Sequence, residues 1–369
     1  MSASTTEVLV IGGGPAGLAA AIASRKKGFS VIVADGAKPP IDKACGEGLL
    51  PGTLAALREL GVNIQARDGQ IFQGIRFVDG TASAEAHLPG DGGLGVRRTV
   101  LHQRMIERAE ECGVELLWNS PVTSISNEGA VVGGKLIQAK WIVGADGLHS
   151  RVRRWSCLNA GARRDVRFAQ RRHYRAKLLT DCVEVHWGRE IQAYVTPLAH
   201  DETCVVLISR NPSIRFEEAL REFPELAGGL RNAELSSVQR GTVTATSKLS
   251  RVYRGNVALA GDASGSVDAI TGEGLGLSFR QALALADALE TGKLAKYQAA
   301  HRRLARRPQV MARVLLLLDR CTPLRRRVLH SLAIDPDLFS RLLTAHVQDT
   351  STAFLAEAGA RLGWRLVTA

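Results

Sequence analysis

The chain has 369 residues, of which 45% are hydrophobic and 23% charged, and a formal net charge of +12. At two to three times the usual domain size of roughly 150 residues, it can bury a large core and is expected to form several domains. The composition excludes fibrous, disordered and very small disulfide-rich proteins. Its 37 glycines exceed the usual share of ~7% and predict tight turns where backbone approaches a ligand closely.

The six cysteines form no CxxC pair, and the N-terminus lacks the basic start and apolar run of a signal peptide. The sequence also contains no stretch of about 18 apolar residues, the length that a membrane-spanning helix needs. We therefore expect a reduced, cytoplasmic protein that does not span a membrane.

The first motif is a strand, a glycine loop and a helix. The apolar run EVLVI leads into GGGPAG and then into an alanine-rich segment. Gly12, Gly14 and Gly17 match GxGxxG, with Ala16 in the same turn, and they supply a tight turn, close approach to a pyrophosphate and close helix–strand packing. The next strand ends in Asp35, where a carboxylate can accept hydrogen bonds from a ribose diol. This pattern predicts a dinucleotide site at a helix N-terminus.

Further elements follow in chain order. GIRFVDGTASAEAHL predicts a hairpin that turns at Asp79-Gly80, and a helical run follows Arg98. PVTSI at 121–125 predicts a strand, and between 163 and 252 three segments of period two predict an antiparallel meander. Two more apolar strands run into Asp146-Gly147 and into Gly261-Asp262, so each strand delivers a carboxylate beside a glycine.

Three motifs in a fixed order resemble one known family. GxGxxG with Asp35, ADGxxS at 145–150 and GDASGxxxxxTGEG at 261–274 are similar to the motifs of the flavoprotein family of para-hydroxybenzoate hydroxylase and geranylgeranyl reductase. The resemblance covers residues 7 to about 290. It implies a chain that binds FAD non-covalently in an extended form.

The resemblance also implies roles for single residues. Asp262 would bond the ribityl hydroxyls, and Asp146-Gly147 would form a turn shared by FAD and the cavity. The helix start at Gly272, Glu273 and Gly274 would face the N1/O2 side of the isoalloxazine, where a positive helix end favours an anionic reduced flavin.

Two further FAD contacts follow from the same resemblance. Arg98 matches the position of an FAD-contacting Arg or Gln, and its neighbour Arg97 is the alternative. Val122 would offer its backbone beside the adenine.

The segment Cys45-Gly46-Glu47-Gly48-Leu49-Leu50-Pro51 resembles the Cys-Gly-Gly-x-x-x-Pro motif of the reductase branch, with Glu47 in place of the second glycine. Gly46 would let the backbone lie along the flavin. Cys45 either sits close to the flavin ring, as a candidate catalytic residue, or is a small buried hydrophobe, the commoner fate of a free thiol.

The fold expected is α/β, with a Rossmann-like FAD-binding domain of the para-hydroxybenzoate hydroxylase type, an antiparallel β-sheet substrate domain and a helical C-terminal region. The FAD-binding domain is predicted from residues 1–70, 95–160 and 250–295, the substrate domain from 71–94 and 161–249, and the helical region from 296–369.

The expected function is that of an FAD-dependent oxidoreductase, as a reductase of an apolar, unsaturated, isoprenoid-like substrate. A flavin monooxygenase is the alternative, and a non-catalytic flavin-binding redox sensor is the alternative from another class. Because the chain has one GxGxxG, NAD(P)H or another reductant would bind only transiently. No metal site is expected, since Cys182, Glu184 and His186 lack a second ligand cluster.

The basic tail leaves two readings open. Residues 296–369 hold 13 Lys and Arg against 5 Asp and Glu, a net of +8. ARVLLLLDRCTPLRRRVLHSLA at 312–333 either forms an interfacial helix pair on an anionic membrane or packs on the FAD domain with its arginines solvated. We expect a small apolar substrate as partner and no nucleic acid. The expected location is cytoplasmic, and the interfacial-helix interpretation adds peripheral contact with the inner membrane face. The sequence carries no signal for the oligomeric state.

Overall fold

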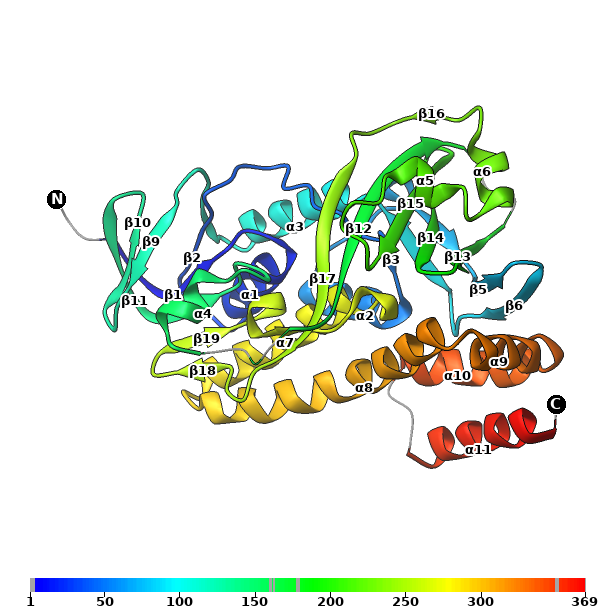
Figure 1. Ribbon diagram of the computed structural model, residues 1–369. Helices are drawn as coiled ribbons and strands as arrows, with labels where there is room; N and C mark the ends of the chain where they lie inside the picture. Colours follow the sequence, from blue (N-terminus) through cyan, green and yellow to red (C-terminus); the bar gives the residue numbers. More distant parts are fainter. Residues whose placement is uncertain (1–3, 159–160, 162, 177–179, 349–351, 369) are drawn as a thin grey trace.

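Two large sheets and a layer of C-terminal helices make up the part of the chain that the computed structural model describes, which is residues 4–158, 161, 163–176, 180–348 and 352–368. Figure 1 shows the first sheet and its helices on one side, the second sheet on the other, and the last helices beneath both.

The first sheet is built around β1 (Ser4–Ile11) and has the order β18-β19-β11-β1-β2-β8. β1 pairs in parallel with β11 and β2. All of β2 (Val31–Ala34) is buried, because a parallel strand between layers is covered on both faces. The other strands of this sheet are β8 (Glu115–Leu117), β9 (Val122–Ile125), β10 (Gly129–Val132), β11 (Lys135–Gly144), β18 (Tyr253–Arg254) and β19 (Val257–Leu259).

Helices α1, α3 and α7 are among the elements that share the largest hydrophobic core with this sheet. α1 (Pro15–Lys26) packs against both α3 (Arg98–Glu111) and α7 (Gly274–Glu290). Small side chains in α1 allow this close packing, since Ala19, Ala20 and Ala21 are at most 1% exposed. α1 and α7 both begin at a glycine-rich loop, so their N-termini lie where the strands of the sheet end.

The second sheet has the order β20-β17-β12-β15-β14-β13-β5-β6. Its neighbours are antiparallel except β13 and β5, which pair in parallel. Its strands are β5 (Gly74–Asp79), β6 (Ala82–His87), β12 (Arg164–Arg175), β13 (Cys182–Trp187), β14 (Ile191–Leu198), β15 (Glu202–Ser209), β16 (Glu234–Leu235), β17 (Arg240–Lys248) and β20 (Gly265–Ser266). Because β20 lies just after Asp262, this sheet reaches directly into the third motif at 261–274.

The remaining elements before the C-terminal region are short. They are β3 (Gly48–Leu49), β4 (Gly69–Phe72) and β7 (Gly93–Val96), which form a small sheet, and α2 (Pro51–Leu60), α4 (Arg151–Trp155), α5 (Phe216–Leu220), α6 (Pro224–Leu230) and the 3₁₀ helices η1 (Ala66–Asp68), η2 (Gly261–Ser264) and η3 (Ala269–Thr271).

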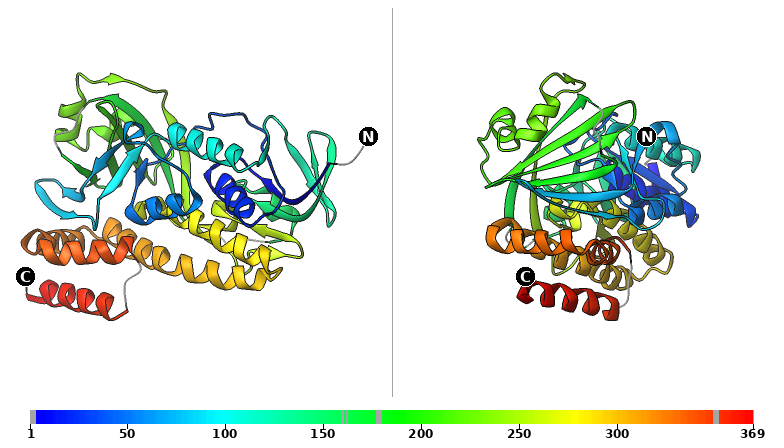
Figure 2. Two further views of the ribbon diagram at one scale, coloured as in Figure 1. Left: turned by 180° about the vertical axis from the view of Figure 1, so that it is seen from behind. Right: turned by 90° about the vertical axis from the view of Figure 1, so that its right-hand side faces the viewer.

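The C-terminal region consists of α8 (Leu294–Arg320), α9 (Thr322–Ile334), α10 (Pro336–Val347) and α11 (Thr352–Thr368). Figures 1 and 2 show these helices along one side of the molecule, with α9 and α10 beneath β5 and β6. Leu318, Phe339 and Leu343 join Phe72 and Ala86 in one hydrophobic cluster. The leucine-rich segment of α8 therefore closes over the second sheet as well as over the loop at Ile270.

The predicted fold class is confirmed, including the Rossmann-like domain, the antiparallel sheet and the helical C-terminus. The hairpin at Asp79-Gly80 forms as β5 and β6, and Gly80 has φ +61°. The parallel pairing of β5 with β13 was not predicted. The exact domain boundaries stay a prediction. In the described residues, none of the helices has the length and apolar character needed to cross a membrane.

Candidate active site

One long cavity of about 1030 Å³ joins the two sheets and the C-terminal helices. It begins at the N-terminus of α1, passes the start of α7 and ends among apolar side chains of the second sheet and of α8 to α10. The predicted site residues that line it are Gly12, Gly14, Ala16, Asp35, Cys45, Gly46, Arg98, Val122, Asp146, Gly147, Gly261, Asp262, Gly272 and Gly274. The structure thus gathers residues from 12 to 274 around one space.

The glycines of the loop at the start of the cavity have different structural roles. Gly12 has φ +112°, and a Cβ there would meet the Ala145 carbonyl oxygen at 2.5 Å. A Cβ on Gly17 would meet the Gly12 oxygen at 1.8 Å, so Gly17 sets the contact of helix and strand behind the cavity. A Cβ on Gly14 would meet nothing within 4 Å, because Gly14 faces the open cavity. A pyrophosphate can therefore approach the backbone at Gly14.

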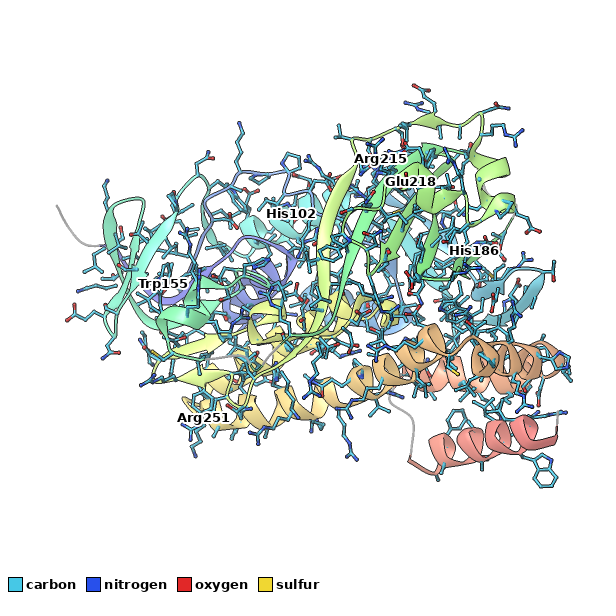
Figure 3. The ribbon with its side chains drawn as sticks, viewed as in Figure 1. His102, Trp155, His186, Arg215, Glu218 and Arg251 are labelled. Atoms are coloured by element: carbon cyan, nitrogen blue, oxygen red, sulfur yellow. The ribbon has the colours of Figure 1, made fainter. Side chains whose placement is uncertain are left out.

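Asp35 holds this loop in place. Its carboxylate accepts hydrogen bonds from the backbone N–H of Gly13 at 2.6 Å and of Ala37 at 2.8 Å. From the other side His102 of α3, labelled in Figure 3, donates through Nε2 to the Gly13 carbonyl at 2.8 Å. Burial lowers the pKa of His102, so its ring is neutral. Asp35 thus fixes the loop and lines the cavity with the same carboxylate.

The two candidate arginines at the start of α3 have different surroundings. Arg97 donates from Nε and Nη2 to the Glu202 carboxylate at 2.7 Å each, and again to Ser236. Arg98 lines the cavity, and its buried Nε has no hydrogen-bond partner among the described residues. Arg98 therefore has the donor that a phosphate or ribityl oxygen would use.

The carboxylates of Asp146 and Asp262 differ in how strongly other protein groups bind them. Asp146 caps α4, since its carboxylate accepts from the Ser150 hydroxyl and from the Arg151 backbone N–H. Asp262 contacts only Lys43 among the described residues, at 3.6 Å, and its side chain is 47% exposed. Asp262 is thus able to accept a hydrogen bond from a ligand hydroxyl.

The N-terminus of α7 faces the cavity through Gly272 and Gly274. Gly272 has φ +67°, and α7 begins at Gly274, so unsatisfied backbone N–H groups point into the cavity. The side chain of Glu273 turns away toward α10, where its Oε2 lies 3.6 Å from His346 Nδ1. His346 Nε2 in turn donates to the Thr271 carbonyl at 2.9 Å. The C-terminal region thus holds the loop that starts α7.

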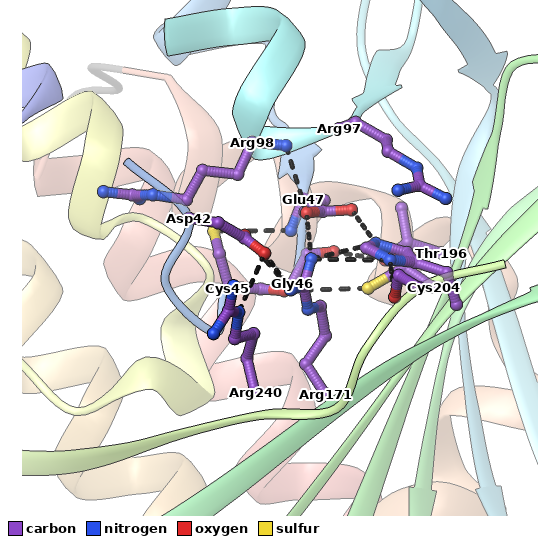
Figure 4. A network of polar contacts seen from close by, with 12 residues as sticks. Asp42, Cys45, Gly46, Glu47, Arg97, Arg98, Arg171, Thr196, Cys204 and Arg240 are labelled. Carbon is purple, nitrogen blue, oxygen red and sulfur yellow. Dashed lines mark hydrogen bonds and ion pairs between the residues drawn. The ribbon is translucent and has the colours of Figure 1, made fainter. Parts of the chain in front are cut away.

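Glu47, which replaces the glycine of the reductase motif, is the centre of the polar network in Figure 4. It is 2% exposed and has φ +60°, a conformation that residues other than glycine adopt with difficulty. Its Oε1 accepts from the Arg98 backbone N–H at 3.0 Å and from Arg171 Nη1 at 3.1 Å, and its Oε2 lies 2.6 Å from His173 Nε2. The carboxylate therefore joins the loop to α3 and to β12.

The same network fixes the backbone on both sides of Glu47. Thr196 of β14 donates to the Gly46 carbonyl at 2.8 Å, and Cys204 of β15 donates to the Cys45 carbonyl at 3.6 Å. Burial raises the pKa of the Cys204 thiol, which stays protonated as this bond requires. The Cys45 side chain itself is partly buried and lines the cavity.

Asp42 completes the network at its outer edge. Arg171 Nη2 donates to its carboxylate at 2.9 Å, and Arg240 Nε donates at 3.2 Å. Burial alone would raise the pKa of Asp42, but the two arginines lower it below its usual value. Glu47, His173 and Cys204 also place potential metal-ligand atoms within 4.8 Å of one another. The Arg171 guanidinium on the same carboxylate disfavours a cation there.

The far half of the cavity is apolar. Its walls come from the second sheet and from the helices α8 to α10, and include Phe72, Ile75, Phe77, Val183, Val185, Val206, Ile208, Leu318, Val328, Leu329, Leu332, Phe339 and Leu343. Val183 and Val185 lie on the cavity wall, whereas Glu184 and His186 of the same strand bond each other at 2.8 Å.

Tyr194 is a polar group in this apolar half. Its hydroxyl donates to Gln192 Oε1 at 3.2 Å, and Arg167 Nη1 donates to the same oxygen at 2.7 Å. Arg167 is paired with Asp268, whose side chain caps η3 just before the TGEG loop. Burial raises the pKa of Tyr194, which is therefore a protonated phenol at neutral pH.

The sequence did not reveal Arg167, Arg171, His173 and Tyr194 as site residues. Arg167, Arg171 and His173 alternate along β12 and are all at most 1% exposed, while Val166 on the opposite face is 41% exposed. Charged residues with period two in a predicted strand were the available signal, but such residues usually mark the solvent face.

The residues present fit FAD. An open glycine loop at a helix N-terminus, a guanidinium nitrogen at Arg98 without a partner among the described residues and a weakly held carboxylate at Asp262 line one cavity, and the family resemblance implies FAD contacts for all three. A second helix N-terminus, that of α7, lies at the far end of this half.

Comparison with known proteins agrees with this geometry. Residues 5–306 match the family model of the FAD binding domain. The chain is 27% identical over 338 residues to the menaquinone reductase of Mycobacterium tuberculosis, with 82% of this chain and 78% of that protein covered. It is 28% identical over 294 residues to digeranylgeranylglycerophospholipid reductase 1 of Methanothermobacter thermautotrophicus, with 73% of each chain covered.

The fold is also that of a monooxygenase structure. The p-nitrophenol 4-monooxygenase PnpA of Pseudomonas putida superimposes with a TM-score of 0.80 at 19% identity, over 95% of this chain and 100% of that one. Reductases and monooxygenases therefore share this scaffold. The chain belongs to the FAD binding domain family and is an FAD-dependent oxidoreductase.

Proposed function

We propose that the protein reduces a carbon–carbon double bond in an apolar, isoprenoid-like substrate. The observation that carries this proposal is the far half of the cavity, which aliphatic and aromatic side chains of β5, β13, α8 and α9 wall on several sides. Burying a long hydrocarbon there is favourable by about 25 cal/mol per Å² of apolar area. The similarity to reductases of menaquinone and of a digeranylgeranyl lipid supports the same substrate class.

FAD, when bound and reduced, would supply the hydride that such a reduction needs. The other requirement is a proton on the second carbon. Tyr194 holds one at Oη inside the apolar half, and we assign the proton donor to it. Arg167, which shares the Gln192 oxygen with Tyr194, would stabilise the phenolate that remains until solvent returns the proton.

The electron donor follows from the single dinucleotide site. We propose that NAD(P)H, or another small reductant, binds transiently and leaves before the apolar substrate reacts. Both molecules would use the cavity itself as their route, since Cys45 and Gly46 line it.

The test is an anaerobic turnover assay. Purified protein with FAD is reduced and mixed in detergent with a geranylgeranyl lipid, which carries no quinone group that the flavin could reduce instead. We expect the flavin to reoxidise and the product mass to rise by two hydrogens. Reduced flavin that persists with every polyprenyl substrate, under conditions where the protein is folded and holds FAD, would contradict the proposal.

A monooxygenase is the second candidate, because Glu47 departs from the reductase motif and the fold is shared with a monooxygenase. The same assay in ¹⁸O₂ separates the two. Incorporation of the label into the product identifies hydroxylation, whereas an unlabelled product with two added hydrogens identifies reduction.

A further inference from the structure

The outer face of α8 carries apolar side chains in water. Val310 is 53% exposed, Val314 is 48% exposed and Leu317 is 54% exposed. Their spacing of four and three residues places them on one stripe of the helix. Leu316 and Leu318, which lie outside this stripe on the same helix, are buried. The stripe is therefore a second apolar face of a helix whose first face already packs on the protein.

Arginines continue this stripe. Arg303, Arg306 and Arg313 are exposed and follow the same helical spacing, seven and four residues before Val310 and three after it. α8 holds seven Lys and Arg in all and one acidic residue, Asp319, which is buried and paired with Arg210. The outer face thus combines exposed positive charge with exposed apolar area.

Other arginines of the tail are already engaged. Arg325 is 2% exposed and donates to Asp79 at 2.9 Å, and Arg320 is paired with Asp165. The interpretation that the arginines of residues 312–333 contact lipid headgroups is therefore wrong for Arg325. Exposed positive charge therefore lies on α8, and also on α9 at Arg326 and Arg327.

The stripe also borders the cavity. Val310 and Val314 line the cavity as well as being exposed, so they stand at its mouth, and Met311, Leu315 and Leu318 continue the wall inward. Leu342 of α10 and Leu362 of α11 contribute to the same wall. Figures 1 and 2 show α8 and α11 along the same side of the molecule. An apolar molecule leaving the mouth would meet this side first.

We propose that the outer face of α8 docks on an anionic lipid bilayer and sets the cavity mouth against it. Val310, Val314 and Leu317 enter the headgroup region, and Arg303, Arg306 and Arg313 contact lipid phosphates. The use of the mouth for an apolar substrate rests on the proposed reductase function, whereas the docking itself rests only on the face of α8. The combination of apolar and cationic groups favours a charged bilayer over a neutral one.

The test is co-sedimentation with vesicles and without substrate. Holoprotein is mixed with vesicles of phosphatidylcholine alone, or with added phosphatidylglycerol, at 0.05 M and 1 M NaCl. We expect the protein to pellet with the anionic vesicles at low salt and to bind severalfold less at 1 M, where the Debye length has fallen to about 3 Å. Protein that remains in the supernatant with anionic vesicles at low salt overturns the proposal.

Matched variants locate the contact. Leu317→Asp, and the double variant Arg303→Glu with Arg306→Glu, should each lower vesicle binding at least tenfold. Val238→Asp, at a residue 75% exposed between β16 and β17, and Arg221→Glu with Arg231→Glu beside α5 and α6 make the same changes at the opposite side of the molecule and should bind as the unaltered protein does. Equal loss in both sets would assign binding to net charge and overturn the role of α8.

The two proposals fail separately. Leu317 and the two arginines do not line the cavity in the described residues, so these variants should keep their FAD and turn over a detergent-dispersed substrate at the original rate. Vesicle binding without any reductase turnover would leave docking intact and reject the proposed substrate. Turnover in detergent without vesicle binding would leave the proposed substrate intact and reject docking.

Discussion

Glu47 shows how a single residue can hold a strained backbone in place. A residue other than glycine at φ +60° costs on the order of 1–3 kcal/mol. Here the carboxylate offsets that cost, because it accepts hydrogen bonds from Arg171 and from the Arg98 backbone and contacts His173. The residue that departs from the family pattern has therefore become the anchor of its loop.

Replacing Glu47 by glycine separates strain from contact. Glu47→Gly removes the strain but leaves Arg171 and His173 with a lost partner in the interior, a change that typically costs roughly 3–5 kcal/mol. We expect a net loss of about 2 kcal/mol in the free energy of unfolding, the difference between the middles of the two ranges, measured by urea denaturation of the holoprotein. Glu47→Gln, which keeps the shape, should lose less. A glycine variant as stable as the original would show that the network contributes no more than the strain costs.

Asp262 gives the most direct test of the cofactor site. In Asp262→Ala, FAD should bind roughly tenfold to 150-fold more weakly, because a hydrogen bond to a charged acceptor is worth about 1.5–3 kcal/mol. Titration of apoprotein with FAD, followed by flavin fluorescence, measures this. Asp337→Ala, at an exposed acid of α10, serves as control. Unchanged affinity in Asp262→Ala would remove the residue from the site.

Substitutions of Tyr194 and of Cys45 test two different steps of the chemistry. Tyr194→Phe should keep its FAD and lose turnover by about 10²–10⁴, the usual contribution of a positioned general acid. Cys45→Ser should keep FAD and change turnover or the flavin redox potential only if the thiol lies against the ring. Stopped-flow reoxidation of reduced enzyme by substrate separates the effects, and equal rates in all three proteins would dismiss both residues.

The glycine loop and α1 show what a sequence motif can specify. The sequence predicted the strand, the turn and the helix start, because each glycine there answers to a local requirement. The alternation along β12 was less informative, since Arg167, Arg171 and His173 face inward and only their partners Asp268 and Glu47, some 100 residues away, explain why. Contacts between distant elements are set by tertiary packing, which a local pattern does not contain.

Two alanine substitutions in the same loop test this division of tasks. Gly17→Ala places a Cβ 1.8 Å from the Gly12 oxygen and should destabilise the protein by about 1–3 kcal/mol. Gly14→Ala meets nothing within 4 Å, so it should leave the apoprotein's stability unchanged and weaken FAD binding. Thermal unfolding with and without FAD measures both. The reverse pattern would mean that the cavity does not hold the pyrophosphate at Gly14.

Helix α8 links stability to pH through a buried histidine. His301 lies 2.9 Å from the Ser264 hydroxyl, and burial lowers its pKa from 6.5 to about 4. Between these values the unfolded chain binds a proton that the folded chain does not, so the free energy of unfolding should fall by about 1.4 kcal/mol per pH unit as the pH drops. Urea denaturation between pH 7 and pH 4 measures the slope, which should be smaller in His301→Gln. An identical slope in the variant would assign it to other groups.

At the scale of the whole molecule, one cavity joins a polar half to an apolar half. The half of the cavity at Gly14, Arg98 and Asp262 offers hydrogen-bond donors and acceptors, and the half beneath β13 offers hydrocarbon. The Glu47 network and the Arg167–Asp268 pair lie between them, each joining a loop of the first half to a strand of the second. The sequence indicated both halves, but it did not show that two buried ion pairs hold them together.

The pairing order of the first sheet has a consequence for synthesis on the ribosome. β1 pairs with β11, and β11 pairs with β19, so the strands that frame the glycine loop come from residues 4–11, 135–144 and 257–259. The nascent chain must therefore emerge past Gly274 before α7 can complete the cofactor pocket. Until α8 to α10 follow, the apolar wall of β5 and β13 faces water. A growing chain of this protein is exposed to aggregation late in translation, and its need for a chaperone should end only when its last helices arrive.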